Sequence, residues 1–140
     1  MNNINKLQLL KSSDIGLFTL KNRKALGKVV HIIGPNICQI ILGLNNLIFK
    51  FNCKLRNTVE NRTSNNDNLS KLVCDSNSIL NNQKIIKVVC YDFDTDGNLL
   101  VDLFNLNSDQ SCINTTLITV GNLSSYNHSD NELFNFNLNN

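Results

Sequence analysis

The sequence has no apolar run long enough to cross a membrane and no signal peptide. Its longest apolar stretch, residues 29–51, is interrupted by the turn Gly34-Pro35-Asn36 and again by Asn45-Asn46, so it cannot form one membrane-spanning helix. The first ten residues mix Asn and Lys with short apolar pairs, whereas a signal peptide needs a continuous apolar core. We therefore expect an intracellular, cytoplasmic protein with no membrane partner.

Patterns typical of metal sites and disulfide frameworks are also missing. The five cysteines are odd in number, show no C-x-x-C spacing and have only two histidines as co-ligands, which argues against zinc and against a disulfide framework. Cys38, Cys53 and Cys90 lie within apolar runs, where cysteine usually acts as a small buried hydrophobic side chain. We expect a reducing compartment and no cofactor, unless the chain proves to be an active calcium-dependent enzyme.

Basic residues are absent from the end of the chain. Every Lys and Arg lies at or before Lys87. The acidic residues that follow it are Asp92, Asp94, Asp96, Asp102, Asp109, Asp130 and Glu132. The net charge of +2 therefore conceals a basic front and an acidic back. Two interpretations stay open: the halves neutralise each other, or the basic half binds a polyanion.

The length of 140 residues predicts a single domain. Asn makes up roughly a fifth of the chain, well outside ordinary usage, and its A/T-rich codons indicate an A/T-rich genome. Residues 1–24 show no sustained periodicity and are expected to form a partly ordered leader. Residues 127–140 are Asn-rich and are expected to be a flexible tail. The folded domain is expected over residues 25–126.

Hydrophobic periodicity predicts a mainly β architecture. Expected strands cover residues 29–33, 37–42, 49–55, 84–90 and 99–104, with turns at 34–36, 43–46 and 94–97. Residues 57–68 read as a loop, and helices are expected over residues 69–80 and 113–120, the second ending at Gly121. Three strands, a helix, two strands and a helix fit an α+β fold, mainly β: a five-stranded barrel of OB-fold type with two or three short helices. Other small α+β arrangements also fit.

Alternation is clearest in residues 49–55. Apolar side chains stand at Phe49, Phe51, Cys53 and Leu55, and polar ones at Lys50, Asn52 and Lys54. Because neighbouring side chains of a strand point to opposite faces, we expect the apolar set to be buried and the polar set to point away from the core.

Four segments resemble, in the same order, motifs of the staphylococcal-nuclease family. Residues 93–103, FDTDGNLLVDL, resemble the hairpin F-D-K-Y-G-R-L-L-V-x-L, and residues 113–121, INTTLITVG, resemble V-N-x-x-L-I-x-x-G. Residues 29–41 resemble V-x-V-I-D-G-D-T-x-x-I, and residues 51–55 resemble F-K-C-R-L. The resemblance spans about residues 28–126 and implies an OB-type barrel.

This resemblance also implies a site for phosphodiester cleavage. In the family, two carboxylates hold calcium, a glutamate helps to activate water and two arginines bind the phosphoryl oxygens. The carboxylate positions correspond to Asn36 and Asn57. The arginine positions correspond to Lys54 and Asn98, and only the glutamate keeps its type, as Glu60. The match needs a two-residue deletion between Lys54 and Asn57.

These substitutions predict a catalytically impaired member of the family. Two neutral amides replace two charges, and calcium affinity depends on the charge of the ligands. Lys54 keeps a positive charge without the bidentate fork, and Asn98 keeps neither. The loss of one transition-state donor commonly costs about 10²- to 10³-fold in rate, so several losses leave little activity.

A second calcium motif is weaker. Residues 92–97, DFDTDG, match the opening of an EF-hand loop, but the twelfth position is Leu103 instead of the required Glu. Strand-forming residues follow instead of a helix. The segment therefore favours a hairpin turn.

The leading functional hypothesis is a non-catalytic nucleic-acid-binding or interaction module, with single-stranded nucleic acid as the partner. Its candidate phosphate contacts are Lys50, Lys54, Arg56 and Arg62. Aromatic residues for base stacking are few, and most of the phenylalanines occupy core-like positions. Two alternatives stay open: a residual calcium-dependent nuclease, and a module that binds only protein.

Overall fold

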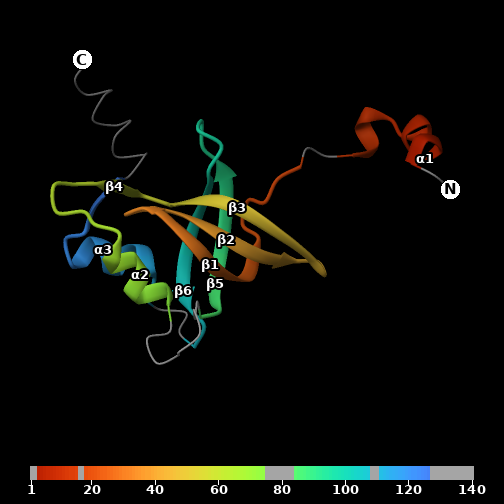
Figure 1. Cartoon of the computed structure of the whole chain (residues 1–140). Coiled ribbons are helices and arrows are strands. Elements are labelled where there is room, and N and C mark those ends of the chain that lie inside the picture. Colours follow the sequence, from red (N-terminus) through yellow and green to blue (C-terminus); the bar gives the residue numbers. More distant parts are fainter. Residues whose placement is uncertain (1–2, 16–17, 75–83, 108–110, 127–140) are drawn as a thin grey trace, which may run out of the picture.

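A computed structural model describes residues 3–15, 18–74, 84–107 and 111–126 of the chain. Five strands close into a barrel in the order β1-β2-β3-β6-β5, which Figure 1 shows with two helices at one end. The barrel strands are β1 (Lys24–Gly34), β2 (Ile37–Leu44), β3 (Leu47–Leu55), β5 (Ile86–Phe93) and β6 (Leu99–Asn105). Strands β3 and β6 run parallel, and the other neighbouring pairs run antiparallel. The predicted α+β barrel of OB-fold type is confirmed.

Short elements complete the fold. They are α1 (Asn3–Leu9), a 3-10 turn η1 (Ser12–Asp14), β4 (Thr58–Glu60), α2 (Asp67–Val73), α3 (Ile113–Thr119) and β7 (Leu123–Ser125). Strands β4 and β7 pair with each other, outside the barrel. This pairing corrects the expectation of a loop over residues 57–68, because three residues of that stretch find a partner strand more than sixty positions away.

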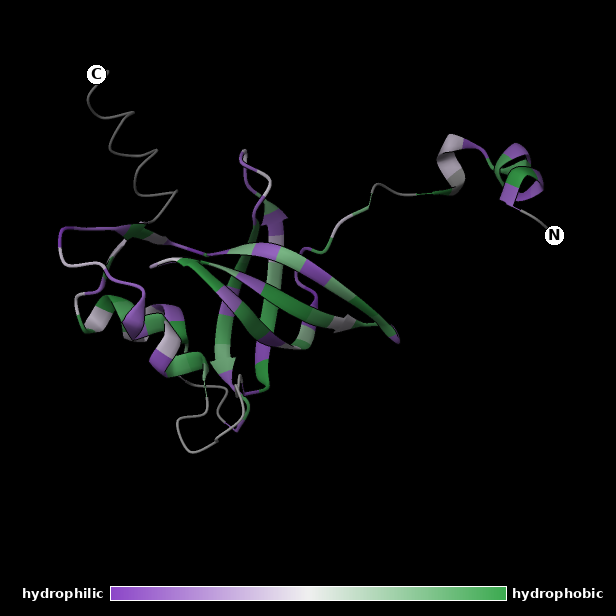
Figure 2. Cartoon of the chain, viewed as in Figure 1, coloured by the Kyte–Doolittle hydropathy of each residue, from purple (hydrophilic) through white to green (hydrophobic). Residues whose placement is uncertain are grey.

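The barrel core follows from the alternation of side chains along the strands. Cross-strand partners share a face, and one inward row is Ile32, Cys38 and Cys53. The helices cover one end of this core with Leu69 and Val73 from α2 and with Ile113 and Leu117 from α3. Figure 2 shows the apolar residues concentrated along the strands, with the polar ones in the turns and on the outer faces of α2 and α3.

The three predicted turns join antiparallel strands. The first contains Pro35 and Asn36, as expected. The second is confined to Asn45 and Asn46, with φ of 50° and 67°, because a tight hairpin turn needs positive φ at both central residues and Asn tolerates it. Strand β2 therefore continues through Leu44, two residues further than predicted. The third turn ends at Gly97, with φ of 83°.

The helix predictions hold in part. Helix α3 matches the expected segment, and Gly121 follows it with φ of 84°, the left-handed conformation typical of a helix end. Helix α2 ends at Val73 because Cys74 is already extended, so the predicted helix over residues 69–80 is too long. Residues 75–83 lie outside the described part of the chain.

The expected leader and tail are described only in part. Helix α1 has no buried residue, whereas Leu20 is buried against the barrel. Residues 127–140, the predicted flexible tail, lie outside the described residues.

Strand β3 confirms the predicted alternation but corrects one buried residue. Cys53 and Leu55 are fully buried and Phe51 is half-buried, yet Phe49 is 41 % exposed. The reason is the register: β6 pairs with β3 only at residues 53–55, so the first half of β3 extends beyond the closed barrel. Lys50 and Asn52 are exposed and Lys54 is half-buried.

Candidate functional site

The outer face of the sheet formed by β1, β2 and β3 carries basic side chains in regular rows. Lys28 is the partner of Ile41, which in turn is the partner of Lys50. Two rows further on the same face, Ile37 is the partner of Lys54. Because cross-strand partners point to the same face, three lysines project from one surface.

Polar side chains fill the row between these lysines. His31 is the partner of Gln39, and Gln39 is the partner of Asn52. We call this surface the basic face. It consists of Lys28, His31, Gln39, Ile41, Lys50, Asn52, Ile37 and Lys54. No Asp or Glu occurs between residues 24 and 55, so the three strands themselves contribute no negative side chain. Lys28 and His31 were not predicted as site residues, although the alternation of side chains along this strand could have placed them on the outer face.

Arg56, a predicted phosphate contact, is instead part of an ion pair. Its Nη2 lies 2.9 Å from Oδ2 of Asp102, and its Nε donates to Oδ1 at 3.3 Å. The guanidinium carbon lies 4.0 Å from the centre of the Tyr91 ring, within cation–π range. The hydrogen bond to Asp102 is the main cause that raises the pKa of Arg56. Its charge is therefore matched within the chain.

Two further groups bind the same carboxylate. The Tyr91 hydroxyl donates to Oδ2 of Asp102 at 2.8 Å, and Nδ2 of Asn114 donates to Oδ1 at 3.1 Å. Burial, followed by this hydrogen bond, raises the pKa of Tyr91. Asn114 also donates to the carbonyls of Arg56 and Val101. We call these four residues, Arg56, Tyr91, Asp102 and Asn114, the Asp102 network; they fasten α3 to β6.

Three of the positions that the sequence resemblance matches to nuclease residues, Asn36, Lys54 and Glu60, lie near the β1–β2 turn. Asn36 is buried, and its Nδ2 donates to the carbonyl and the hydroxyl oxygen of Thr58 at 3.3 and 3.2 Å. Oε1 of Glu60 lies 3.5 Å from the place that a Cβ atom on Gly34 would occupy. Lys54 is the cross-strand partner of Ile37, the residue after Asn36.

The other two matched positions, Asn57 and Asn98, lie away from this turn and take part in other hydrogen bonds within the chain. Asn57 is exposed with φ of 63°, and its carbonyl accepts a hydrogen bond from the backbone of Tyr126. Asn98 lies in the β5–β6 turn, where its backbone N–H donates to Oδ1 of Asp94 at 2.9 Å. Arg62 is exposed in the segment after β4.

These positions do not fit a calcium site of the nuclease type. The hydrogens of the Asn36 amide are directed at Thr58, and Glu60 is the only carboxylate among the corresponding residues. Within the ranges that the structure describes, no group of three or more His, Cys, Asp or Glu side chains could hold a metal. Asp94 accepts two backbone N–H groups in its own turn, as expected for a hairpin instead of an EF-hand loop.

The cysteines behave as predicted from their apolar surroundings. Cys38, Cys53 and Cys90 are buried, and all five cysteines are free thiols. Burial raises the pKa of the Cys38 thiol to about 12 and also raises those of Cys53 and Cys90. Because the thiolate is the reactive form, these three groups are poor nucleophiles.

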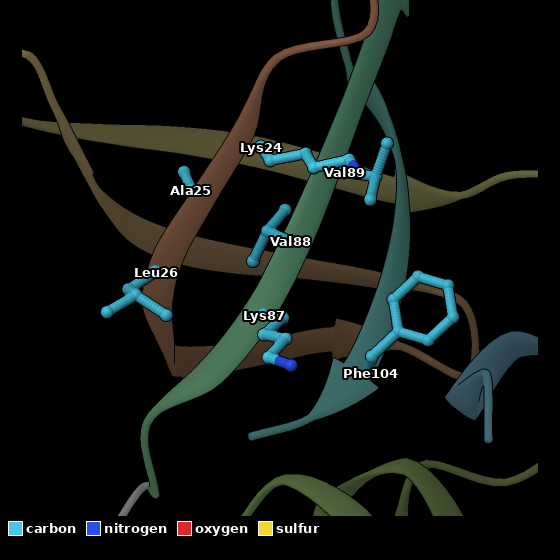
Figure 3. A pocket seen from close by; sticks show the side chains of 7 residues that line it. All are labelled: Lys24, Ala25, Leu26, Lys87, Val88, Val89 and Phe104. Carbon is cyan, nitrogen blue, oxygen red and sulfur yellow. The ribbon is translucent and has the colours of Figure 1, made fainter. Parts of the chain in front are cut away.

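A second surface feature lies across β1, β5 and β6. It is a shallow hollow of about 520 Å³ with an apolar floor and Lys24 and Lys87 at its sides, shown in Figure 3. Leu26 and Phe104 form part of its wall. No local pattern in the sequence predicts this hollow, because it combines β1 with the β5–β6 hairpin, which lies far along the chain.

No protein-family model matches the sequence, and no curated protein matches it. No helix among the described residues is long and apolar enough to cross a membrane. The chain forms an OB-type barrel with a basic face on the sheet of β1, β2 and β3.

Proposed function

We propose that this chain is a nuclease-like OB module that binds single-stranded nucleic acid and does not cleave it. The observation that carries the proposal is the basic face, on which Lys28 of β1 and Lys50 and Lys54 of β3 lie on either side of β2, with no acidic residue in any of the three strands. OB barrels bind oligonucleotides on the face of their second and third strands. Lysines on that face would neutralise phosphates without reading sequence.

The absence of cleavage rests on the residues at the corresponding catalytic positions. Asn36 is engaged with Thr58, Asn98 is engaged with Asp94 in its own turn, and Asn57 supplies no charge. Glu60 and Lys54 remain near the β1–β2 turn, but one carboxylate and one ammonium group cannot replace a calcium site and two arginines. The similarity to the staphylococcal-nuclease family is part of this proposal and rests on the four sequence segments.

A fluorescence-anisotropy titration with a labelled oligothymidylate tests the binding. The expected affinity falls steeply with salt, with a log–log slope of about 0.7 per phosphate contacted. Lys50→Glu with Lys54→Glu should weaken binding and flatten that slope. The matched control, Lys6→Glu with Lys71→Glu, reverses two exposed charges on α1 and α2 and should have a much smaller effect. An equal loss of affinity in both double variants would mean that the basic face is not the binding surface.

A cleavage assay separates this proposal from the residual nuclease. Single-stranded substrate with millimolar calcium should stay intact over the time in which it binds, and the same sample with chelator should look identical. Calcium-dependent cleavage that Glu60→Gln abolishes would establish the nuclease instead.

A protein-binding module is the second candidate, because the hollow beside β5 has exposed apolar walls. Leu26 there is 53 % exposed, and contiguous exposed apolar surface often marks a protein contact. If no single-stranded oligonucleotide binds at about 50 mM salt, the protein-binding module is favoured.

A further inference from the structure

Three phenylalanine rings follow one another where β3 leaves the barrel. The rings of Phe49 and Phe51 have their centres 6.1 Å apart, and those of Phe51 and Phe93 lie 6.0 Å apart. The two outer rings are open to solvent, with Phe49 exposed to 41 % and Phe93 to 43 %. We call these three residues the ring ladder. Its exposure differs from the expectation that most of the phenylalanines occupy core-like positions.

A small hollow continues the ring ladder on the side of Phe49. It has a volume of about 220 Å³, and Phe18, Leu20, Leu47 and Arg23 contribute to its lining together with Phe49 and Phe51. Phe18 is 78 % exposed. A guanidinium group beside several aromatic rings offers both a flat stacking surface and a positive charge.

The basic face and the ring ladder are the two sides of the same strand. Lys50 belongs to the outward row with Ile41, whereas Phe49 and Phe51 belong to inward rows with Leu42 and Ile40. Among the described residues, 47–51 of β3 pair with β2 alone, since β6 begins to pair at Cys53. A chain lying on the basic face can therefore reach the rings by passing over this free edge.

We propose that the ring ladder is a base-stacking platform, on which a base of the bound strand packs against Phe49 or Phe93. This inference rests on the proposed function. Every nucleobase has a π-face, so stacking on aromatic side chains tolerates any sequence. Lys50 and Arg23 provide positive charge on the two sides of β3 for the adjoining phosphates. The carboxylates of Asp92, Asp94 and Asp96 repel phosphate from the β5–β6 hairpin, which leaves Phe93 to meet a base.

Phe49→Leu and Phe93→Leu test the platform, because leucine keeps the apolar contact and removes the ring. Each variant should bind oligothymidylate about 5- to 150-fold more weakly, the range that corresponds to about 1–3 kcal/mol per stacked base. The salt slope should stay unchanged, since no phosphate contact is lost. The control is Phe104→Leu, a ring on β6 that lines the other hollow, which should bind like the parent chain.

A strand of the same length without bases gives the second measurement. The unaltered protein should bind this abasic strand at least as weakly as either leucine variant binds the normal one, and neither substitution should weaken binding of the abasic strand further. If a leucine variant folds poorly, the comparison of the normal and the abasic strand on the parent chain alone still tests the platform.

The outcomes separate the two proposals. If no strand binds at low salt, the proposed function fails, and the platform fails with it. If strands bind with a normal salt slope but the ring variants, the control and the abasic strand all bind alike, only the platform is overturned. If the parent chain self-associates and Phe49→Leu does not, the ring ladder is a protein contact, which also overturns it.

Discussion

At position 36 the chain has an amide whose hydrogens are both directed at oxygen atoms. Thr58 uses its own hydroxyl proton to donate to the carbonyl of Leu55 at 2.7 Å, so its Oγ1 can only accept from Asn36. A carboxylate at this place would have no proton to give and would face two acceptors. The amide of Asn36 therefore stabilises the junction of the β1–β2 turn with β4.

Asn36→Asp should destabilise the fold by about 1–3 kcal/mol at neutral pH, the usual cost of leaving buried polar groups without partners. Urea unfolding measures the change. The control Asn57→Asp lies at an exposed site and should change stability by less than about 0.5 kcal/mol. If Asn36→Asp leaves the free energy of unfolding unchanged, position 36 must open readily to solvent and to ions.

Calcium at millimolar concentration should leave the melting temperature of the parent chain unchanged, because an ion that does not bind the native state cannot stabilise it. Differential scanning fluorimetry with magnesium as the matched control ion measures this. A rise specific to calcium would show that oxygen ligands come together in a way that the sequence resemblance does not identify.

Four buried or half-buried groups make the fold sensitive to alkaline pH. The pKa of Cys38 rises from its ordinary value of 9.0 to about 12, and those of Cys53, Cys90 and Tyr91 are also raised. The unfolded chain then loses these protons first, so the free energy of unfolding should stay level below about pH 9 and fall as pH rises toward 12. Each group contributes at most about 1.4 kcal/mol per pH unit.

Urea titrations at several pH values between 8 and 11 measure this slope. Cys38→Ala should make it shallower, even though the substitution lowers stability at every pH. A slope that does not depend on Cys38 would mean that its thiol is as accessible to water in the folded chain as in the unfolded chain.

At the scale of elements, the Asp102 network decides how α3 sits on the barrel. Asn114 binds the backbone at three points, because its Oδ1 accepts from the N–H of Leu103 and its Nδ2 donates to the carbonyls of Arg56 and Val101. The helix has only seven residues, too few to be stable in isolation. Tertiary contacts of this kind must hold it.

Asn114→Ala should therefore cost about 2 kcal/mol or more, since several buried groups lose their partner together. Urea unfolding gives the value, and hydrogen exchange should show faster opening of α3 than of β2. Thr115→Ala on the exposed side of the same helix is the control and should change stability by less than about 0.5 kcal/mol. If Asn114→Ala and Thr115→Ala lower the stability equally, the Asp102 network does not hold α3 on the barrel.

The strands were the predictable part of the fold. Alternation fixed the faces of β3, and turn residues such as Gly97 marked where chains reverse. The ends of elements were less predictable, because they depend on partners distant in sequence. Strand β4 forms only because β7 lies beside it, and Phe49 is exposed only because β6 stops pairing at Cys53.

The candidate site was predictable in its residue types and less so in its grouping. Lys50 and Lys54 stand on one face because they are four positions apart in a strand. Arg56 shares their parity, but its interaction with Asp102 involves a residue forty-six positions away, which no local pattern reveals. The register that places Lys28 opposite Ile41 is likewise a property of strand pairing.

At the scale of the whole molecule, the asymmetry of charge is resolved in two different ways. The ion pair between Arg56 and Asp102 joins the basic half to the acidic half inside the fold. The lysines of the basic face lie on strands without acidic residues, whereas Asp92, Asp94 and Asp96 gather at the β5–β6 hairpin. Charge pairing between the two halves and a basic face without acidic residues in its strands therefore exist in the same molecule, in different places.

The acidic hairpin lies beside the proposed path of the strand, because Phe93 at its base contacts Phe51 of β3. Asp94→Asn with Asp96→Asn should therefore tighten the binding of oligothymidylate several-fold at low salt. An asparagine at position 94 still offers an oxygen to the backbone N–H groups of residues 96 and 98, so the turn should persist.

The gain should fade as salt rises, since the screening length shrinks from about 10 Å at 0.1 M to about 3 Å at 1 M. Asp67→Asn, in the first turn of α2, removes an exposed acid away from β3 and serves as the control. If the double substitution and the control give the same affinity at every salt concentration, the hairpin does not face the bound strand. The phosphates would then have to follow the basic face toward β1, away from the ring ladder, and the effects of Phe93→Leu and Lys28→Glu would decide between the two paths.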